Sequence, residues 1–533
     1  MNEQARLLVM DFGGQYKELI ARTVRGLNVY SEILPGNVSA ERVRELAPIG
    51  IIFTGGPKSV YRLDAPVCDP GIFSLGIPVL GICYGMHMMC HMLGGEVAAG
   101  EVSEYGRVPA QLDTGAARTS GAARTSSAAR ASGAALFDGL RQEVRVLMSH
   151  RDYVKKLPEG FVSTARTEAC PNAAFEDTRR KLYGVQFHPE VEHTEQGREV
   201  IRNFLYNICG ASADYHLDDV IERQAAMIRE RAGDERILLA LSGGVDSSVC
   251  AALISKAVPG QLVCIFVDHG FMRLKEPEEI AETFGTSRDL NFISVNAQER
   301  FMEKIKGVTD PERKRKIVGE EFIRVFEEEA RRLEAGHRGP VKIFAQGTIY
   351  PDVIESGGLF GATIKSHHNV GGLPERLEFQ EKLEPLAGLF KDEVRALGRK
   401  LGLPQALVER QPFPGPGLSI RIMGEVTREK LDILRQADYI FRQEVEKCGE
   451  PPQQYFAVFT GARSVGVMGD ARTYDHVIAL RAVETSDFMT CEYSPIPHEV
   501  LARASSRIVN EVKGVSRVVY DITSKPPATV EWE

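Results

Sequence analysis

The chain has 533 residues, of which 43% are hydrophobic and 26% charged, and its net charge is −8. This length is too great for a single hydrophobic core, so about three domains are expected. The negative charge gives no general attraction to nucleic acid or to anionic lipid, so we expect neither as a partner. The N-terminus MNEQARLLVMDFGG lacks the features of a secretory signal and no apolar run is long enough to span a membrane, so a cytoplasmic location is expected.

The first part of the chain alternates short apolar runs with helical stretches. This pattern is typical of an α/β sheet that is covered on both faces. We expect the α/β domain to span residues 1–207. Its candidate strands lie in RLLVMDFG (6–13), GIIFTGGP (50–57), IPVLGICYGM (77–86) and KLYGVQFHPE (181–190).

Residues 217–232 predict a charged amphipathic helix that leads into a second α/β series. We place this second domain at 208–412. Its strands are expected within the apolar runs 236–244, 260–270, 288–296 and 341–351.

Around position 412 the sequence changes to QPFPGPGLSI, where proline removes backbone donors and disfavours a continuing helix. The helical stretch 429–448 and the runs YFAVFTG, HVIALRAVE and SRVVYDIT then indicate a smaller domain at 413–533. The predicted fold is therefore α/β, with two consecutive open α/β sheet domains followed by a smaller α+β C-terminal domain.

A low-complexity segment interrupts the first domain, where GAARTS, GAARTS and SAARAS follow one another from Gly115 to Ser132. These repeats offer few large apolar groups to a core, so we expect a solvated insertion. Its three arginines are a weak basis for a nucleic-acid-binding arm. The sequence does not explain what the insertion does.

The string LSGGVDSS (241–248) follows the apolar run RILLA and precedes a helical stretch, so a glycine-rich turn is expected to open a helix. Such a turn directs unpaired N–H groups and the positive end of the helix dipole at one point, which favours a phosphate. A tight turn with a serine cap is the simpler alternative. We expect Asp246 to bind Mg²⁺ or to position the loop. The expected ATP-binding residues of the loop are Ser242, Gly243, Gly244, Val245, Asp246, Ser247 and Ser248.

This string resembles the ATP pyrophosphatases, in which SGGxDS holds the β- and γ-phosphates of ATP while a substrate oxygen attacks the α-phosphate. Three further residues are expected at the same ATP site. Val267 closes the next strand and Gly347 follows another, at the carboxyl edge where open α/β sheets bind ligands. Lys391, in LFKDEVR, is expected to meet the triphosphate as a cation.

The motif GICYG places Cys83 between two glycines, after a buried strand and before a helix. It is the thiol counterpart of the GxSxG nucleophile elbow, where a helix N-terminus favours the thiolate. His188 and Glu190 lie two residues apart at the end of a strand, so both side chains are expected to point to the same face. They could supply the base and its partner. The turn TGGP (54–57) could bind an oxyanion. The pattern indicates amide hydrolysis through a thioester, and a merely buried cysteine is the simpler alternative.

These motifs resemble the class I glutamine amidotransferases over nearly all of residues 1–207. The resemblance assigns the nucleophile to Cys83, the base to His188, the partner of the base to Glu190, and the oxyanion site to Gly56.

Two positions depart from the amidotransferase pattern. The usual GICYGMQ has His87 in place of the glutamine that helps to hold the substrate, and the usual MSHGD has Arg151 in place of glycine. An imidazole cannot offer the donor and the acceptor of an amide together, so glutamine affinity is the property that we expect to change.

A glutaminase joined to an ATP pyrophosphatase delivers ammonia to an adenylated carbon. FPGPGLSIRI, KSHHNVGGLP (365–374) and SKPPATVEWE resemble the GMP synthetase family, and the resemblance covers almost the whole chain. It implies ATP, XMP and glutamine as substrates, Mg²⁺ on the phosphates, a lid at 365–374 that carries Lys365 and two histidines, and a homodimer. The XMP-binding residues that it implies are Arg421, Lys525, Thr529 and Glu531.

The expected reaction is glutamine-dependent GMP synthesis, in which ATP adenylates XMP and ammonia displaces AMP. One alternative is a nucleotide sensor that keeps the fold without turnover, but such a protein would be expected to have lost part of the catalytic set. Another alternative is an ATP-dependent amidotransferase that acts on deamido-NAD or tRNA. Measuring AMP release with each acceptor separates these alternatives.

Overall fold

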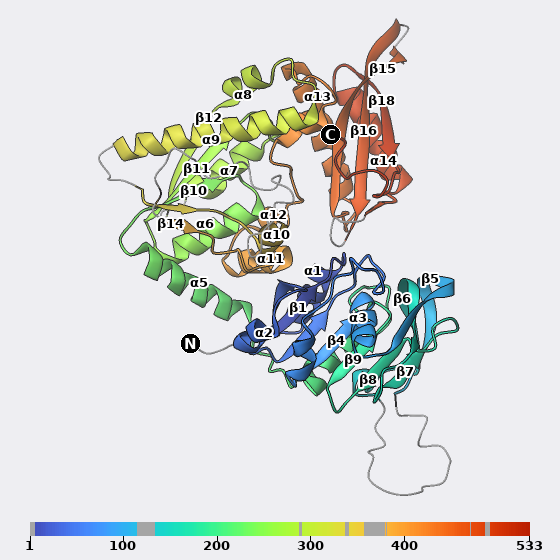
Figure 1. Cartoon of the computed structure of the whole chain (residues 1–533). Coiled ribbons are helices and arrows are strands. Elements are labelled where there is room, and N and C mark those ends of the chain that lie inside the picture. The colour runs from blue at the N-terminus through green and yellow to red at the C-terminus, as the bar shows by residue number, and fades with distance from the viewer. Residues whose placement is uncertain are drawn as a thin grey trace, which may run out of the picture. The chain divides into compact units, whose positions relative to one another are not determined.

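The computed structural model describes residues 6–114, 134–286, 290–335, 341–355, 379, 381–468, 471–485 and 491–533. The chain forms two compact units, Met1–His216 and Leu217–Glu533 (Figure 1). The predicted insertion at 115–132 and the predicted lid at 365–374 lie outside the described residues.

The first unit is built on a nine-stranded mixed sheet in the order β2-β1-β3-β4-β9-β8-β7-β5-β6. In the parallel half of the sheet, β4 leads directly into α3 through the turn that contains Cys83. The parallel strands are β1 (Arg6–Asp11), β2 (Tyr30–Pro35), β3 (Gly50–Phe53), β4 (Val79–Ile82) and β9 (Leu182–Val185). The antiparallel extension consists of β5 (Glu96–Leu112), β6 (Glu143–Lys156), β7 (Val162–Arg166) and β8 (Ala174–Asp177).

Helices pack against the parallel half of this sheet. The core beside α3 combines strand residues such as Phe53 with Met86 and Met89 of the helix, all of which are fully buried. Burying such side chains removes apolar surface from water, which is the main stabilising contribution. The helices of this unit are α1 (Lys17–Arg25), α2 (Ala40–Leu46), α3 (Tyr84–Met92) and α4 (Gly197–Asn203).

The second unit contains a five-stranded parallel sheet in the order β12-β11-β10-β13-β14. Figure 1 shows α9 on one side of this sheet and α5, α6 and α11 on the other, as expected for parallel strands buried on both faces. The strands are β10 (Ile237–Leu241), β11 (Leu262–Asp268), β12 (Leu290–Asn296), β13 (Ile343–Ala345) and β14 (Glu381–Leu383). The helices are α5 (Leu217–Ala232), α6 (Val245–Ala257), α7 (Glu276–Gly285), α8 (Gln298–Ile305), α9 (Pro311–Ala335), α10 (Tyr350–Glu355), α11 (Lys391–Lys400) and α12 (Gln405–Val408).

The C-terminal part of this unit adds a second sheet, which is covered by two helices. Strand β16 pairs with β15 and β17 in antiparallel fashion and with β18 in parallel. Residues of the parallel sheet, such as Leu238, and of this part, such as Phe441, belong to one continuous core. Because this core includes residues on both sides of position 412, the predicted domain boundary there stays a prediction. The elements are α13 (Arg428–Glu446), β15 (Gln454–Met468), β16 (Ala471–Glu484), β17 (Glu492–Tyr493), α14 (His498–Glu511) and β18 (Val515–Asp521).

The predicted fold class is confirmed, since two α/β sheets are followed by a smaller mixed sheet with helices. Among the described parts of the chain, no helix is long and apolar enough to cross a membrane.

Candidate active sites

The first candidate site is the turn between β4 and α3. Cys83 occupies this turn with φ +51° and ψ −106°, a strained conformation that residues with side chains rarely adopt. A Cβ at Gly81 would lie 2.6 Å from the Met86 nitrogen. A Cβ at Gly85 would lie 2.6 Å from the Phe53 Cβ. The turn therefore needs both glycines, and it presents Cys83 at the N-terminus of α3, where the helix dipole favours a thiolate.

His188 and Glu190 form a buried pair beside this thiol. Strand β9 ends at Val185, so both side chains lie in the following turn and not on the strand that was predicted to align them. His188 Nδ1 donates to Glu190 Oε1 at 2.7 Å, and Thr194 Oγ1 donates to the His188 carbonyl at 2.6 Å. Burial lowers the pKa of His188, but the charge of Glu190 and a hydrogen bond with Cys83 outweigh it and raise this pKa well above 6.5. The charged imidazolium form of His188 is therefore favoured.

The TGGP turn after β3 lies against the same residues. A Cβ at Gly55 would be 3.4 Å from His188 Cε1 and 3.9 Å from Cys83 Cβ. At Gly56, the predicted oxyanion residue, a Cβ would be 2.9 Å from the Tyr84 ring. Tyr84 follows Cys83, the predicted nucleophile, and begins α3, so its N–H has no intrahelical acceptor. This second candidate oxyanion donor was not among the residues predicted from the sequence, although the elbow motif implies it.

His87, the first departure from the amidotransferase pattern, lies one turn along α3 from Cys83. Its Nε2 is 2.5 Å from Gln186 Oε1, and Gln186 Nε2 donates to Cys83 Sγ at 3.9 Å. Burial lowers the pKa of His87 to about 4, so the ring is neutral. His87 is therefore engaged by Gln186, a residue that had not been predicted to belong to the site. Arg151, the second departure, is exposed on β6.

A second buried group in the first unit brings atoms of Glu104, His150 and Cys170 within 4.8 Å of one another. These residue types can bind a metal ion. Glu104 already accepts a hydrogen bond from Thr167 Oγ1 at 2.8 Å and lies 3.1 Å from His150 Nε2. His150 Nδ1 donates to the Asp152 carbonyl at 2.8 Å. Because the carboxylate and the imidazole have protein partners, we assign the group a structural role.

The second candidate site is the loop between β10 and α6. Gly244 is the N-cap of α6, and Gly243 has φ +77°. A Cβ at Gly243 would lie 2.1 Å from Ile280 Cδ1 of α7, so only glycine fits here. Ser242 Oγ accepts from the Gly244 N–H at 3.3 Å and lies 3.0 Å from Ser247 Oγ. Hydroxyl groups thus hold the loop in shape.

The first turn of α6 supplies the rest of the predicted phosphate loop. Val245 is buried at the start of the helix, and Ser248 Oγ donates to the Gly244 carbonyl at 2.8 Å. The N–H groups of a first helical turn have no helical acceptor and converge at the positive end of the dipole. A phosphate is the natural ligand of this arrangement.

Two of the three outlying ATP residues come close to this loop. Lys391 Nζ lies 2.7 and 2.6 Å from the two carboxylate oxygens of Asp246. A Cβ at Gly347 would be 2.9 Å from the Ser247 nitrogen, so this glycine packs directly on the loop. Val267 is buried near the end of β11, the strand beside β10.

Three of the four predicted XMP residues come together in the C-terminal part of the second unit. Arg421 is fully buried and donates two hydrogen bonds to the carboxylate of Glu531, at 2.9 and 2.7 Å. Thr529 Oγ1 donates to the Glu531 carbonyl at 2.5 Å. Lys525 pairs through its backbone with Cys491, at 2.8 and 3.0 Å. The carboxylate of Glu531 is thus committed to Arg421 before any ligand arrives.

Arg273 lies beside this set but was not predicted. Its guanidinium carbon is 4.1 Å from the centre of the Phe413 ring, and that of Arg421 is 5.4 Å from the same ring. Burial lowers the pKa of Arg273 to about 10. Arg273 Nε and Arg421 Nη1 are buried and have no partner among the described residues. The sequence signal was a cation shortly after the carboxyl end of β11, where such sheets bind ligands.

Comparison with known proteins decides the family. The family model of class I glutamine amidotransferases matches residues 8–208, and that of the GMP synthase C terminal domain matches residues 443–532. The chain is 58% identical over 529 residues to the GMP synthase (glutamine-hydrolyzing) of Acetivibrio thermocellus, covering 99% of both. The chain belongs to the glutamine-hydrolyzing GMP synthase family.

Further members of this GMP synthase family match over the same length. The proteins of that name from Clostridium botulinum and Treponema denticola are each 55% identical to the chain, which covers 99% and 97% of them. The resemblance drawn from FPGPGLSIRI and SKPPATVEWE is therefore confirmed. Family membership leaves the role of each side chain to be proposed from its geometry.

Proposed function

We propose how the residues of this chain divide the work of glutamine-dependent GMP synthesis, the activity of its family. The chain is a carbon-nitrogen ligase that converts ATP, XMP, glutamine and water into GMP, AMP, pyrophosphate and glutamate. We assign glutamine hydrolysis to the first unit and the adenylation and amination of XMP to the second. The observation that carries the proposal is the occurrence of a buried Cys83–His188 pair and of a phosphate loop in one chain.

In the first half-reaction Cys83 is the nucleophile. Its thiolate attacks the side-chain carbonyl carbon of glutamine, and the N–H groups of Gly56 and Tyr84 stabilise the oxyanion. His188 then gives its proton to the departing ammonia, which leaves a thioester on Cys83. Water attacks the thioester and gives a proton to His188, and glutamate departs. Glu190 keeps the imidazole oriented and stabilises its charged form.

In the second half-reaction the loop at 242–248 holds the β- and γ-phosphates of ATP. The C2 oxygen of XMP attacks the α-phosphorus, the bond to the β-phosphate breaks, and pyrophosphate leaves. Ammonia then attacks C2 of the purine, AMP departs with the oxygen, and a proton is lost to give GMP. The loop amides contribute by stabilising the negative charge of the leaving pyrophosphate.

Asp246 would hold Mg²⁺. Its carboxylate faces the position that the Lys391 ammonium occupies, so it is directed at a place that accepts a cation. Mg²⁺ binds one or two carboxylates together with phosphate oxygens, and the single Asp246 carboxylate beside the proposed phosphate loop is consistent with that coordination. When bound, the ion would spread the charge of the phosphates. Lys391 would move from Asp246 to the triphosphate, as the sequence predicted.

We assign XMP binding to Lys525, Thr529, Glu531 and Arg421, and we add Arg273. Each of the two arginines has a buried nitrogen without a partner among the described residues, and this supports a dianionic phosphate between them, because a buried N–H without an acceptor is costly. Glu531 would then face the base or the ribose. This assignment keeps the four predicted residues. The atoms proposed to bind the phosphate are Arg273 Nε and Arg421 Nη1.

We further propose that the protein is a cytoplasmic homodimer. A row of exposed apolar side chains on β15 and β16 supports the dimer: Val465 is 58% exposed, Val467 is 72% exposed, and Tyr474, which pairs with Val465, is 61% exposed. Alternate strand residues share a face, so the two valines form one patch. Light scattering of the wild type and of Val467→Lys tests the dimer. A monomeric wild type would refute it.

The proposal as a whole is tested by ATP-dependent conversion of XMP with glutamine or ammonium as the nitrogen donor. GMP formation with both donors is expected. No GMP with either donor would refute the assignment.

A further inference from the structure

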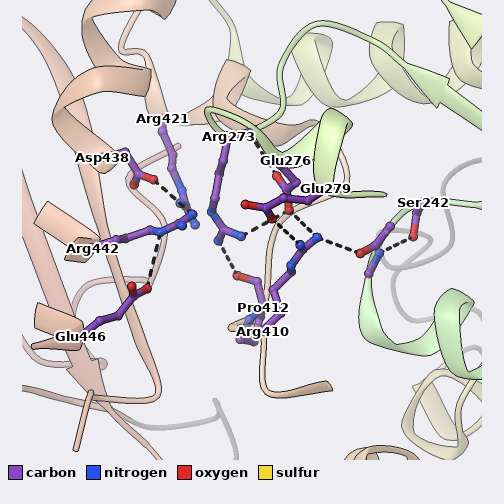
Figure 2. Close-up of polar contacts among 12 residues, drawn as sticks. Ser242, Arg273, Glu276, Glu279, Arg410, Pro412, Arg421, Asp438, Arg442 and Glu446 are labelled. Atoms are coloured by element: carbon purple, nitrogen blue, oxygen red, sulfur yellow. Dashed lines mark hydrogen bonds and ion pairs between the residues drawn. The ribbon is translucent and has the colours of Figure 1, made fainter. Parts of the chain in front are cut away.

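Arg410, which lies just after α12, holds the phosphate loop against α7. Its Nη1 donates to the Gly243 carbonyl at 3.1 Å and to Glu276 Oε1 at 3.0 Å, and its Nη2 donates to Glu279 Oε2 at 3.0 Å (Figure 2). The Arg410 backbone is anchored in turn, because Arg395 donates to its carbonyl at 2.9 Å. One guanidinium therefore ties the backbone of the loop to two carboxylates of α7.

Glu276 links this clamp to the arginine pair of the proposed XMP site. Its Oε1, which accepts from Arg410, is also 3.7 Å from the guanidinium nitrogen Nη1 of Arg273, and its Oε2 accepts from the backbone N–H of Arg273 at 3.1 Å. The carboxylate is only 6% exposed, so its charge is little screened by water. Arg273 and Arg410 therefore share one buried negative charge.

The other side of Arg273 faces Arg421 across Phe413. Both guanidinium groups contact this ring, and the charge of Arg421 disfavours the charged form of Arg273. Arg273 Nε and Arg421 Nη1 have no acceptor within the part of the chain that the structure describes. An anion placed between the two would relieve their repulsion and satisfy both nitrogens.

We propose that Arg410 is a positioning residue that couples phosphate bound at Arg273 and Arg421 to the shape of the ATP loop. The inference rests on the proposed XMP site. A phosphate monoester dianion draws Arg273 away from Glu276, and the carboxylate then interacts more strongly with Arg410. The strengthened clamp fixes the Gly243 carbonyl and with it the direction of the loop amides. XMP thus raises the affinity for ATP, and ATP raises the affinity for XMP by the same factor.

The proposal depends on the forked shape of the arginine side chain. A lysine at position 410 keeps the positive charge, but its single ammonium cannot reach the Gly243 carbonyl, Glu276 and Glu279 in one fixed geometry. Arg410→Lys is therefore the informative variant. Arg507→Lys is the matched control, because Arg507 also pairs with two carboxylates, those of Glu444 and Glu511, on α13 and α14 away from the loop.

The experiment uses the full-length chain with Mg²⁺ and measures binding of α,β-methylene ATP by calorimetry, with and without saturating XMP. The wild type and Arg507→Lys should bind the analogue about tenfold more tightly when XMP is present. In Arg410→Lys the gain should fall below about twofold, whereas glutamine hydrolysis by the first unit persists. The double variant Arg410→Lys with Glu276→Gln should show no further loss of the gain, because both changes break one path.

Two results would overturn the inference. One is a full XMP-dependent gain in Arg410→Lys, which would make the residue a structural contact only. The other is a wild type that makes GMP but shows no gain, which would remove the coupling and leave the proposed function intact. A wild type that binds XMP yet makes no GMP would instead count against the proposed function.

Discussion

His87 Nε2 lies 2.5 Å from Gln186 Oε1, so the two side chains share a hydrogen bond inside the glutaminase site. An amide oxygen only accepts, so the imidazole carries its proton on Nε2. Gln186 then has its amide nitrogen directed at Cys83 Sγ, 3.9 Å away. The residue that replaces the usual glutamine of the family motif is therefore engaged within the protein and has only Nδ1 left to offer a substrate.

Replacing this histidine should improve glutamine binding. In His87→Gln one group of the new amide can meet Gln186 while the other meets the substrate. One neutral hydrogen bond contributes about 1 kcal/mol, so we expect KM for glutamine to fall about fivefold to tenfold with kcat nearly unchanged. Steady-state glutamate release measures both constants. An unchanged KM would mean that position 87 does not reach the substrate.

His87 should also make the folded chain sensitive to acid. Burial holds its pKa at about 4, against 6.5 for an ordinary histidine. The unfolded chain takes up the proton more readily than the folded chain. The free energy of unfolding is therefore unaffected by the titration of His87 above pH 6.5 and decreases as the pH falls from 6.5 toward 4. At about pH 5 the loss is about 2 kcal/mol. The Tm of His87→Gln should therefore fall less than that of the wild type between about pH 7 and pH 5. Equal decreases in Tm would contradict the assignment.

Removing the nucleophile should separate the two half-reactions. Cys83→Ala is expected to abolish GMP synthesis from glutamine and to retain synthesis from ammonium, because ammonium bypasses the thioester. Cys90→Ala is a matched control, since Cys90 is also a buried cysteine, lies on α3 and has no assigned role in the reaction. Loss of synthesis from both nitrogen donors in Cys83→Ala would identify the residue as structural.

The second unit should respond in the opposite way. Asp246→Asn removes the carboxylate proposed to hold Mg²⁺, so GMP synthesis should fail with both nitrogen donors while glutamine hydrolysis continues. Lys391→Met removes the cation that faces Asp246 at 2.6 Å and should raise KM for ATP by about tenfold or more, since hydrogen bonds to charged groups contribute about 1.5–3 kcal/mol. Initial rates with each donor measure both effects. Normal ATP kinetics in Lys391→Met would show that this lysine does not reach the triphosphate.

Most of the fold could be predicted because periodicity and glycine placement are local properties. The helix expected at 217–232 is α5 with the same bounds, and the run 236–244 contains β10 and the start of the phosphate loop. The elbow around Cys83 and the loop at Ser242 were predictable for the same reason, since each lies within a few residues of one strand and one helix.

The parts of the sites that could not be predicted from the sequence are contacts between residues far apart in the chain. His87 and Gln186 are 99 positions apart, and Arg410 and Gly243 are 167 positions apart. Tertiary packing decides such pairings, and hydrophobic periodicity does not encode it. The alignment of His188 with Glu190 was predicted for the wrong reason, because hydrogen bonding in a turn and not strand alternation brings them together.

The fate of the ATP phosphates tests most directly whether the loop around Ser242 holds the leaving pyrophosphate. ATP labelled at the α-phosphate is incubated with XMP, ammonium and Mg²⁺, and the nucleotide products are separated and counted. Labelled AMP that forms in equal amount with GMP and pyrophosphate is the predicted result. Labelled ADP accompanied by free phosphate would contradict it.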